Sequence, residues 1–291
     1  MIELLSLIIA GVAVGSLYGV LALGVTTLLK GTDVPNFAQG SFGLVSAYVT
    51  YWLATLVHAW LPLALIGGVL AAAAVGYTAD RIAMRRMIGA PIVSLLIFTL
   101  GLQITITNIP QIFFGADTQT LPSFVPSGHF GSASLNVPYE NVLVIVAAAA
   151  IALGTSQFFA RTRVGLNMRA SSEHRTWPQY IGVNVPGVLS LTWLLAGLLG
   201  GLAGILIASQ TYLDPNVMDA ALIPAFTAAA IGGFRSILGS YAGGLVLGVT
   251  ENLVAGYISA DFEKSVSFFF LLIVLIIRPQ GLFGTRQERR A

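Results

Sequence analysis

The sequence predicts an all-α integral membrane protein, a polytopic bundle of eight or nine transmembrane spans in which some helices are broken or re-entrant. Of its 291 residues, 56% are hydrophobic and only 9% are charged, whereas a typical soluble domain carries roughly 25% charged residues. Too few charges are available to cover a water-facing surface, so the apolar residues are expected to face lipid. The 32 glycines agree, because glycine lets membrane helices approach closely.

A spanning helix needs about 20 apolar residues, and nine runs approach that length. They are residues 4–29, 40–57, 61–80, 92–113, 141–160, 187–209, 217–234, 237–258 and 265–280. The first run exceeds the apolar segment of a signal peptide, so we expect it to be a spanning helix. The run 217–234 contains Pro224 and is expected to be broken or re-entrant. Residues 1–291 are expected to form a single membrane domain.

The positive residues predict the orientation of these spans. Arginines follow the third run (Arg81, Arg85 and Arg86), the fifth (Arg161, Arg163, Arg169 and Arg175), the seventh (Arg235) and the ninth (Arg278, Arg286, Arg289 and Arg290). Lys30 falls on the same side. Because basic short loops stay in the cytoplasm, the N-terminus is expected outside and the C-terminus inside. Lys264 is the exception, beside Asp261 and Glu263. The loop 115–140 would lie outside, where it could cap the outer mouth, dock a partner or only connect two spans.

Signatures of enzymes and of metal or nucleic-acid binding are missing. No glycine-rich loop ends in Lys-Ser or Lys-Thr, which excludes a P-loop nucleotide site. His58, His129 and His174 lie far apart without metal-ligand spacing, and the chain has no cysteine, so thiolate metal sites and disulfides are excluded. The basic residues lie between apolar runs rather than in a stripe, which argues against a nucleic-acid partner. We expect no catalytic residue, metal or cofactor in this chain.

Polar residues inside spans normally face a cavity or a neighbouring helix, because exposing them to lipid is costly. Asn36 and Gln39 follow Pro35, which ends helical continuity. A helix broken at membrane depth is typical of transport sites, so both residues are candidates for a translocation pathway. A cytoplasmic turn that starts the second span is the alternative.

Two further polar groups are also candidates for the pathway, each with structural alternatives. Gln103, Thr107 and Gln111 form one helix stripe, with Asn108 beside them. They could line the pathway or hydrogen-bond to neighbouring helices. Glu251 is the clearest carboxylate within a run. It could line the pathway, pair with another helix, or be protonated and hydrogen-bonded in a structural role.

Glycines at helical spacing predict two faces for close helix packing, either within the chain or between subunits. These faces are Gly197, Gly200, Gly201 and Gly204 on one span, and Gly239, Gly243, Gly244 and Gly248 on another. The basic loop at about 161–186 is long enough for one or two short helices at the membrane face. A solvated loop would explain its arginines but not the glycines at each end.

At this loop, and over nearly the whole chain, the sequence resembles the inner-membrane permease family of bacterial branched-chain amino acid ABC importers. The resemblance is carried by a series of patches in order: Tyr18-Gly19-Val20-Leu21-Ala22-Leu23-Gly24, Asn36-Phe37-Ala38-Gln39-Gly40, Phe114-Gly115, Thr162-Arg163 with Gly165, Arg169-Ala170, Ile181-Gly182-Val183, Ala196-Gly197 through Gly204, Phe226-Thr227-Ala228-Ala229, Ile231-Gly232-Gly233, Gly243-Gly244-Leu245 with Leu247-Gly248 and Glu251, and Arg278-Pro279 with Gly281-Leu282-Phe283-Gly284. Each patch alone is weak, and their order and spacing together make the match.

The resemblance implies an ABC importer permease fold and half of a translocation pathway for branched-chain or other amino acids in the bacterial inner membrane. The implied partners are a second permease (a paralogue or a second copy), two ATPase subunits that bind the ATP, and a periplasmic or lipid-anchored substrate-binding protein. Loop 161–186 would couple to the ATPases through five residues: Arg163, Gly165, Arg169, Ala170 and Gly182. Residues 171–180 depart from the family pattern, and Trp177-Pro178 should interrupt a helix there.

Three other functions remain open on the sequence. A urea or short-amide permease of the same family would share these patches. A stand-alone secondary transporter or channel would need ionisable residues within its spans for ion coupling, and Glu251 is the one good candidate. A membrane-embedded enzyme would need a catalytic cluster, which the sequence does not show.

Overall fold

A computed structural model describes residues 2–32, 34–87, 89–115, 117–126, 128–130, 137–173, 184–278 and 280–283. Its elements in chain order are α1 (Ile2–Thr32), α2 (Gln39–Tyr51) continued by the π-helical turn η1 (Trp52–Leu56), α3 (Leu61–Ile82), the 3₁₀ turn η2 (Met84–Met87), α4 (Ile92–Phe114), β1 (His129–Phe130), β2 (Val137–Pro138), α5 (Tyr139–Arg161), α6 (Arg163–Glu173), α8 (Val185–Gln210), α9 (Val217–Gly232), α10 (Ile237–Tyr257), the 3₁₀ turn η3 (Ala260–Phe262) and α11 (Glu263–Ile277). The fold is helical, as predicted, and each of the nine apolar runs is a helix.

Six of the described helices are long and apolar enough to cross a membrane alone: α1, α3, α4, α5, α8 and α10. The apolar helices α2, α9 and α11 are shorter. The 16 residues of α9 reach about 24 Å at 1.5 Å per residue, less than the roughly 30 Å hydrocarbon core of a bilayer. These lengths match the expectation of broken or re-entrant helices, and the number of full crossings stays a prediction.

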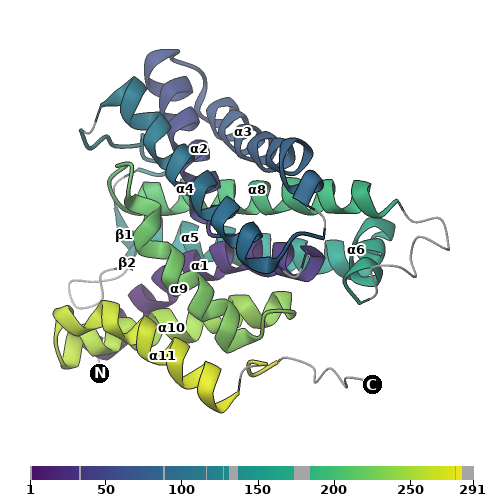
Figure 1. Ribbon diagram of the computed structural model, residues 1–291. Coiled ribbons are helices and arrows are strands. Elements are labelled where there is room, and N and C mark those ends of the chain that lie inside the picture. The colour runs from purple at the N-terminus through teal and green to yellow at the C-terminus, as the bar shows by residue number, and fades with distance from the viewer. Residues whose placement is uncertain are drawn as a thin grey trace.

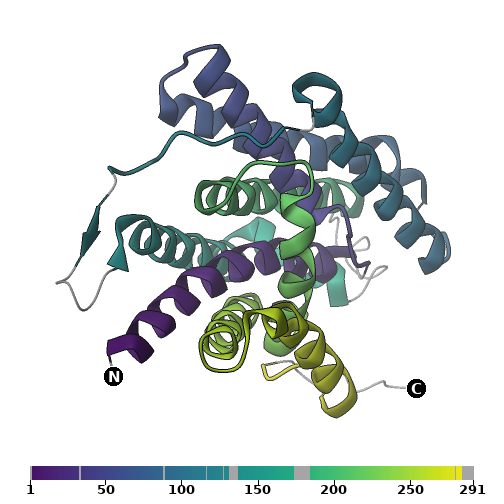
Figure 2. The same ribbon diagram turned by 90° about the vertical axis from the view of Figure 1, so that its left-hand side faces the viewer.

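The helices α1 and α8 lie side by side at the centre of the bundle (Figure 1). α2, α3 and α4 lie on the α8 side of this pair, whereas α9, α10 and α11 lie on the α1 side. Turned by 90°, the bundle shows α5 next to α1 and both strands at the same end as the N-terminus (Figure 2). The strands form one antiparallel pair, with His129 opposite Pro138. A hydrophobic core of α1, α2, α8 and α9 residues fills the middle.

Both predicted glycine faces pack inside the chain. A Cβ added at Gly204 of α8 would lie 2.2 Å from the carbonyl oxygen of Gly43 on α2, closer than any real side chain approaches. On α10, Gly243 meets α9 at the carbonyl of Ala228, and Gly244 meets α1 at Gly15 and Gly19. Small residues therefore set the distances between the central helices.

Candidate functional site

The chain breaks at Pro35, as the sequence predicts, and re-enters the bundle before α2. α1 ends at Thr32, residues 34–36 are irregular, and α2 begins at Gln39. The Gln39 Nε2 donates a hydrogen bond of 2.9 Å to the carbonyl oxygen of Ala196, the twelfth of the 26 residues of α8. The N-terminus of α2 therefore lies near the middle of a spanning helix, and Gln39 is completely buried there.

Asn36 shapes this entry. Its Oδ1 accepts a hydrogen bond of 3.0 Å from the backbone N–H of Ala38, which turns the chain into the first turn of α2. Only 1% of Asn36 is exposed. Within the described part of the chain, the Asn36 Nδ2 and the Gln39 Oε1 are buried without a hydrogen-bond partner. Both predicted residues therefore lie inside the bundle rather than in a solvated turn.

The polar stripe of α4 faces α2 and α9. The Gln103 Nε2 donates to the Asp219 Oδ1 at 2.9 Å, and the hydroxyl of Thr107 lies 3.4 Å from that of Ser41 on α2. Gln103 is the twelfth of the 23 residues of α4, so this contact is also at the midpoint of a spanning helix. Asn108 is exposed on another face, where its Nδ2 donates to the carbonyl of Ile104 on the same helix.

Asp219 was not among the predicted site residues, because it lies at the edge of the predicted run 217–234. In the structure it lies in the first turn of α9. A repeated pair of residues could have indicated its position. Pro35-Asn36 precedes α2 by two residues, and Pro215-Asn216 directly precedes α9. The starts of both helices meet, since a Cβ added at Gly40 would lie 3.3 Å from the Met218 Cβ.

Glu251 has a different environment. It is 1% exposed, and its carboxyl accepts a short hydrogen bond from the hydroxyl of Ser267 on α11. The side chain of Tyr18 on α1 also hydrogen-bonds to it. The carbonyl of Ser267 in turn accepts from the Thr227 hydroxyl on α9 at 3.1 Å. Glu251 thus joins α1, α10 and α11, and the structure does not bring it to Gln39 or Gln103.

A short amphipathic helix, α6, follows α5 at the end of the bundle that carries the basic segments. The Thr162 hydroxyl accepts a hydrogen bond of 3.0 Å from the Gly165 N–H and so caps α6. Gly165 rests on the backbone of α5, because an added Cβ would lie 2.6 Å from the Phe159 Cα. Met168, 1% exposed, fills the core against α1 and α8.

The outer face of α6 carries the exposed residues Arg163 and Leu166, with Arg169 and Ala170 partly buried. The helix therefore has one face fixed to the spans and one face open. Of the five predicted coupling residues, four lie on this helix, whereas Gly182 and the departing stretch around Trp177-Pro178 lie outside the described residues.

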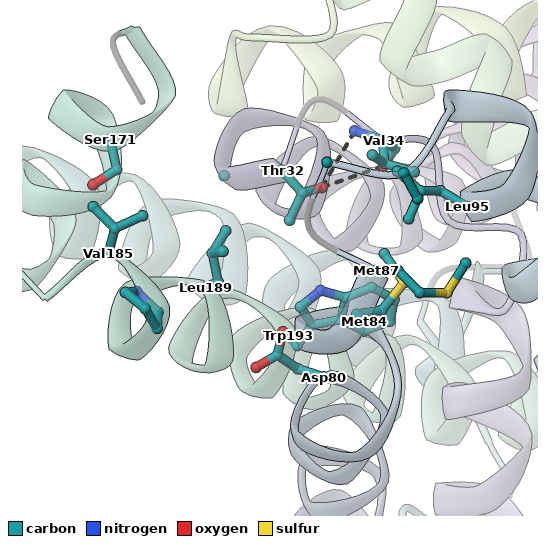
Figure 3. Close-up of a pocket in the computed structure, with 14 residues that line it drawn as sticks. Thr32, Val34, Asp80, Met84, Met87, Leu95, Ser171, Val185, Leu189 and Trp193 are labelled. Carbon is teal, nitrogen blue, oxygen red and sulfur yellow. Dashed lines mark hydrogen bonds between the residues drawn. The ribbon is translucent and has the colours of Figure 1, made fainter. Parts of the chain in front are cut away.

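A cavity of about 180 Å³ separates α6 and the start of α8 from α3, η2 and α4 (Figure 3). Ser171 and Val185 lie on one side of it, with Met84 and Met87 on the other.

Beside this cavity, the buried Asp80 at the end of α3 accepts a hydrogen bond from the Ser190 hydroxyl on α8. Arg85 lies 3.8 Å from the Asp80 carboxylate and donates to the Pro186 carbonyl at 2.9 Å. No local sequence pattern predicts this polar link between α3 and α8, because its partners are more than 100 residues apart.

Comparisons with known proteins show which family the sequence matches. The sequence model of the family described as branched-chain amino acid transport system / permease component matches residues 7–277. The chain is 29% identical over 290 residues to the high-affinity branched-chain amino acid transport system permease protein BraD of Pseudomonas aeruginosa, covering 95% of this chain and 94% of that protein. It is 31% identical over 290 residues to the permease protein LivH of Salmonella typhimurium, covering 94% and 93%.

Among solved structures, PsaBC from Streptococcus pneumoniae in complex with Fab aligns with 94% of this chain and 91% of that chain, with a TM-score of 0.48 and 17% identity. This likeness is too distant to support an inference about the chain.

Proposed function

This chain belongs to the family of permease components of branched-chain amino acid transport systems, and we propose that it forms one half of the membrane pathway of an ATP-driven importer for branched-chain or related amino acids. It is a multi-pass membrane subunit and not itself an enzyme. The second half of the pathway is another permease, a paralogue or a second copy. Two ATPase subunits bind the ATP, and a substrate-binding protein delivers cargo from outside.

The observation that carries this proposal is the docking of α6. One face is held by Gly165 on α5 and by Met168 in the core, so a push on α6 moves α5, α1 and α8. The other face presents Arg163 and the exposed side chain of Leu166, an apolar residue beside a cation. A surface of this kind suits a protein partner better than water. α6 is therefore the proposed contact for the ATPases.

The cavity beside α6 supports the same role. Residues of α6 and α8 line it opposite those of η2 and α4 (Figure 3). Close-packed interiors resist displacement of their elements, because every shift forces neighbours to move. The space next to Ser171 would let α6 move toward η2 without repacking the core.

The test is import by the complete complex in lipid vesicles. We expect uptake of a radiolabelled branched-chain amino acid only when ATP, both ATPase subunits and the binding protein are supplied. The variant Gly165→Ala should lower uptake by roughly tenfold, the scale of known coupling changes, because its new Cβ pushes α6 off Phe159.

Gly154→Ala on α5 is the matched control, because a Cβ there meets nothing within 4 Å. Membrane insertion of both variants is checked on the purified protein. Uptake by this chain without the ATPases would contradict the proposal and favour a stand-alone transporter or channel. Normal uptake by the Gly165→Ala variant would contradict the role of α6.

A further inference from the structure

Below its first turn, α9 is buried on every side except one narrow stripe. Between residues 221 and 232, only Ile223 and Phe226 are not buried. They continue the line of the exposed Asp219, since positions i, i+4 and i+7 share one face of a helix. α1, α2, α10 and α11 cover the other sides, and Ile223 and Phe226 face a groove whose walls include Ile92 at the start of α4 and Phe268 on α11. The stripe therefore has a carboxylate at its start and apolar side chains below it.

The position of Asp219 excludes lipid as its neighbour. Its carboxylate accepts a hydrogen bond from Gln103 at the midpoint of α4, so it lies near the middle of the membrane. An ionisable group at that depth faces a water-filled cavity or another protein, because exposure to lipid is costly. Asp219 is nevertheless exposed on this chain. The side of the second permease, where the aqueous pathway runs in the proposed function, satisfies this requirement.

We propose that Asp219 contacts the ammonium group of an amino acid as it passes, and that it selects cargo with a cationic amino group. This inference rests on the proposed function and adds to it one residue and one chemical feature of the cargo. Gln103 has a positioning role, because its amide holds the Oδ1 of this exposed carboxylate. A carboxylate held in this way is a suitable partner for an ammonium group.

An apolar groove below Asp219 suits the rest of such a cargo. It has a volume of about 570 Å³, and Ile223, Phe226 and Phe37 contribute to its lining. The rings of Phe37 and Phe226 lie 5.5 Å apart, so the break before α2 also contributes to this wall. An aliphatic side chain would lose water against these surfaces, which favours branched-chain cargo over polar cargo.

A second observation points to the same place. The N-termini of α2 and α9 meet at this depth, and the neighbouring Gln39 and Asn36 are buried with an unpartnered Oε1 and Nδ2 in the described part of the chain. Helix N-termini attract negative groups, and the Nδ2 is a donor. The joint start of the two short helices therefore suits the carboxylate of a zwitterion, whereas the buried Gln39 amide faces α1 and α8.

The first experiment uses the complete complex in vesicles. Asp219→Asn keeps the shape of the side chain and removes its charge. We expect uptake of radiolabelled leucine to fall by about tenfold or more, as for the loss of a partly desolvated charge contact, while ATP hydrolysis stimulated by the loaded binding protein persists. Asp219→Glu should recover part of the uptake. Asp261→Asn removes an exposed carboxylate of η3 and should leave uptake unchanged.

The second experiment uses the lack of cysteine in this chain. The variant Asp219→Cys is treated with a cationic, water-soluble methanethiosulfonate, and labelling of this chain is measured by mass spectrometry. We expect rapid labelling, slowed at least severalfold when loaded binding protein and ATP drive cargo through the complex. Leu70→Cys on α3 is the control at similar depth. Leu70 is exposed beside the exposed apolar Ile66, so a cysteine at this position should stay unlabelled.

These results separate this inference from the proposed function. Wild-type complex that fails to import at all would overturn the proposed function. Wild-type import with equal import by the Asp219→Asn variant would overturn only the role of Asp219. Labelling at position 219 that is as slow as at position 70 would also overturn the role of Asp219. Labelling at position 219 that is not slowed by cargo would do the same.

Discussion

Two carboxylates within the helices of this protein have opposite surroundings. Glu251 is enclosed by Ser267 and Tyr18, whereas Asp219 is exposed and accepts a hydrogen bond from the Gln103 amide. The sequence indicated Glu251 and not Asp219, because position within an apolar run says nothing about which neighbours a side chain meets. Asp219 also lies at the start of the run 217–234, which was expected to be broken or re-entrant, so its depth in the membrane could not be predicted from hydropathy.

At Glu251, a substitution separates a structural role from a pathway role. Glu251→Ala should lower the free energy of unfolding by about 1–3 kcal/mol, because the buried Ser267 hydroxyl loses its acceptor. Glu251→Gln keeps an acceptor and should retain most of that stability. Thermal unfolding of the purified chain in detergent measures both.

The predicted pathway role of Glu251 has its own signature. A stable Glu251→Gln variant that imports poorly would support that role, whereas normal import would restrict Glu251 to joining α1, α10 and α11. Ser267→Ala serves as the partner control, because it removes the same hydrogen bond from the other side.

At the scale of elements, all nine apolar runs became helices within a few residues of their predicted bounds. Apolar length and charge predict where a helix lies in the sequence. They do not predict how deep its ends lie, so the depth of Asp219 was missed although the predicted run and α9 both begin at residue 217. The break before α2 could be predicted, because Pro35 removes a backbone donor. The link of Asp80 to Ser190 depends on which helices become neighbours, and no local pattern records that.

The crossing of α2 and α8 gives a prediction for a pair of elements. Gly204→Ala should cost about 1–3 kcal/mol of stability through overpacking, because its Cβ would overlap the backbone of Gly43. Gly101→Ala on α4 is the matched control, since a Cβ there meets nothing within 4 Å. Thermal unfolding in detergent compares the two, and equal loss in both variants would contradict the packing argument.

At the scale of the whole molecule, the structure gathers the basic segments at one end. The Lys30 Nζ donates to the Arg235 carbonyl at 3.3 Å, and Lys30 also lies over the ring of Phe159. Arg85 reaches the start of α8. At the other end, Gln119 of the loop 115–140 pairs with Leu213. The orientation stays a prediction: basic segments favour the cytoplasm, so the end that carries α6 is expected there.

Orientation can be measured with single cysteines in this cysteine-free chain. Ser123→Cys, in the loop 115–140, should react with a membrane-impermeant thiol reagent added outside intact cells. Leu166→Cys, on the open face of α6, should react only after the membrane is made permeable. The reverse pattern would place the N-terminus inside and would exclude α6 as the ATPase contact.

The length of α1 has a consequence for the surrounding lipid. Its 31 residues extend about 46 Å, well beyond the roughly 30 Å of a bilayer's hydrocarbon core. A helix this long tilts or projects, and the tilt increases as the bilayer becomes thinner. α10 packs against α1 through Gly244 and Gly248, so it must tilt as well. Hydrophobic mismatch therefore acts on the bundle through α1, and lipid chain length should change its transport rate even when every subunit is present.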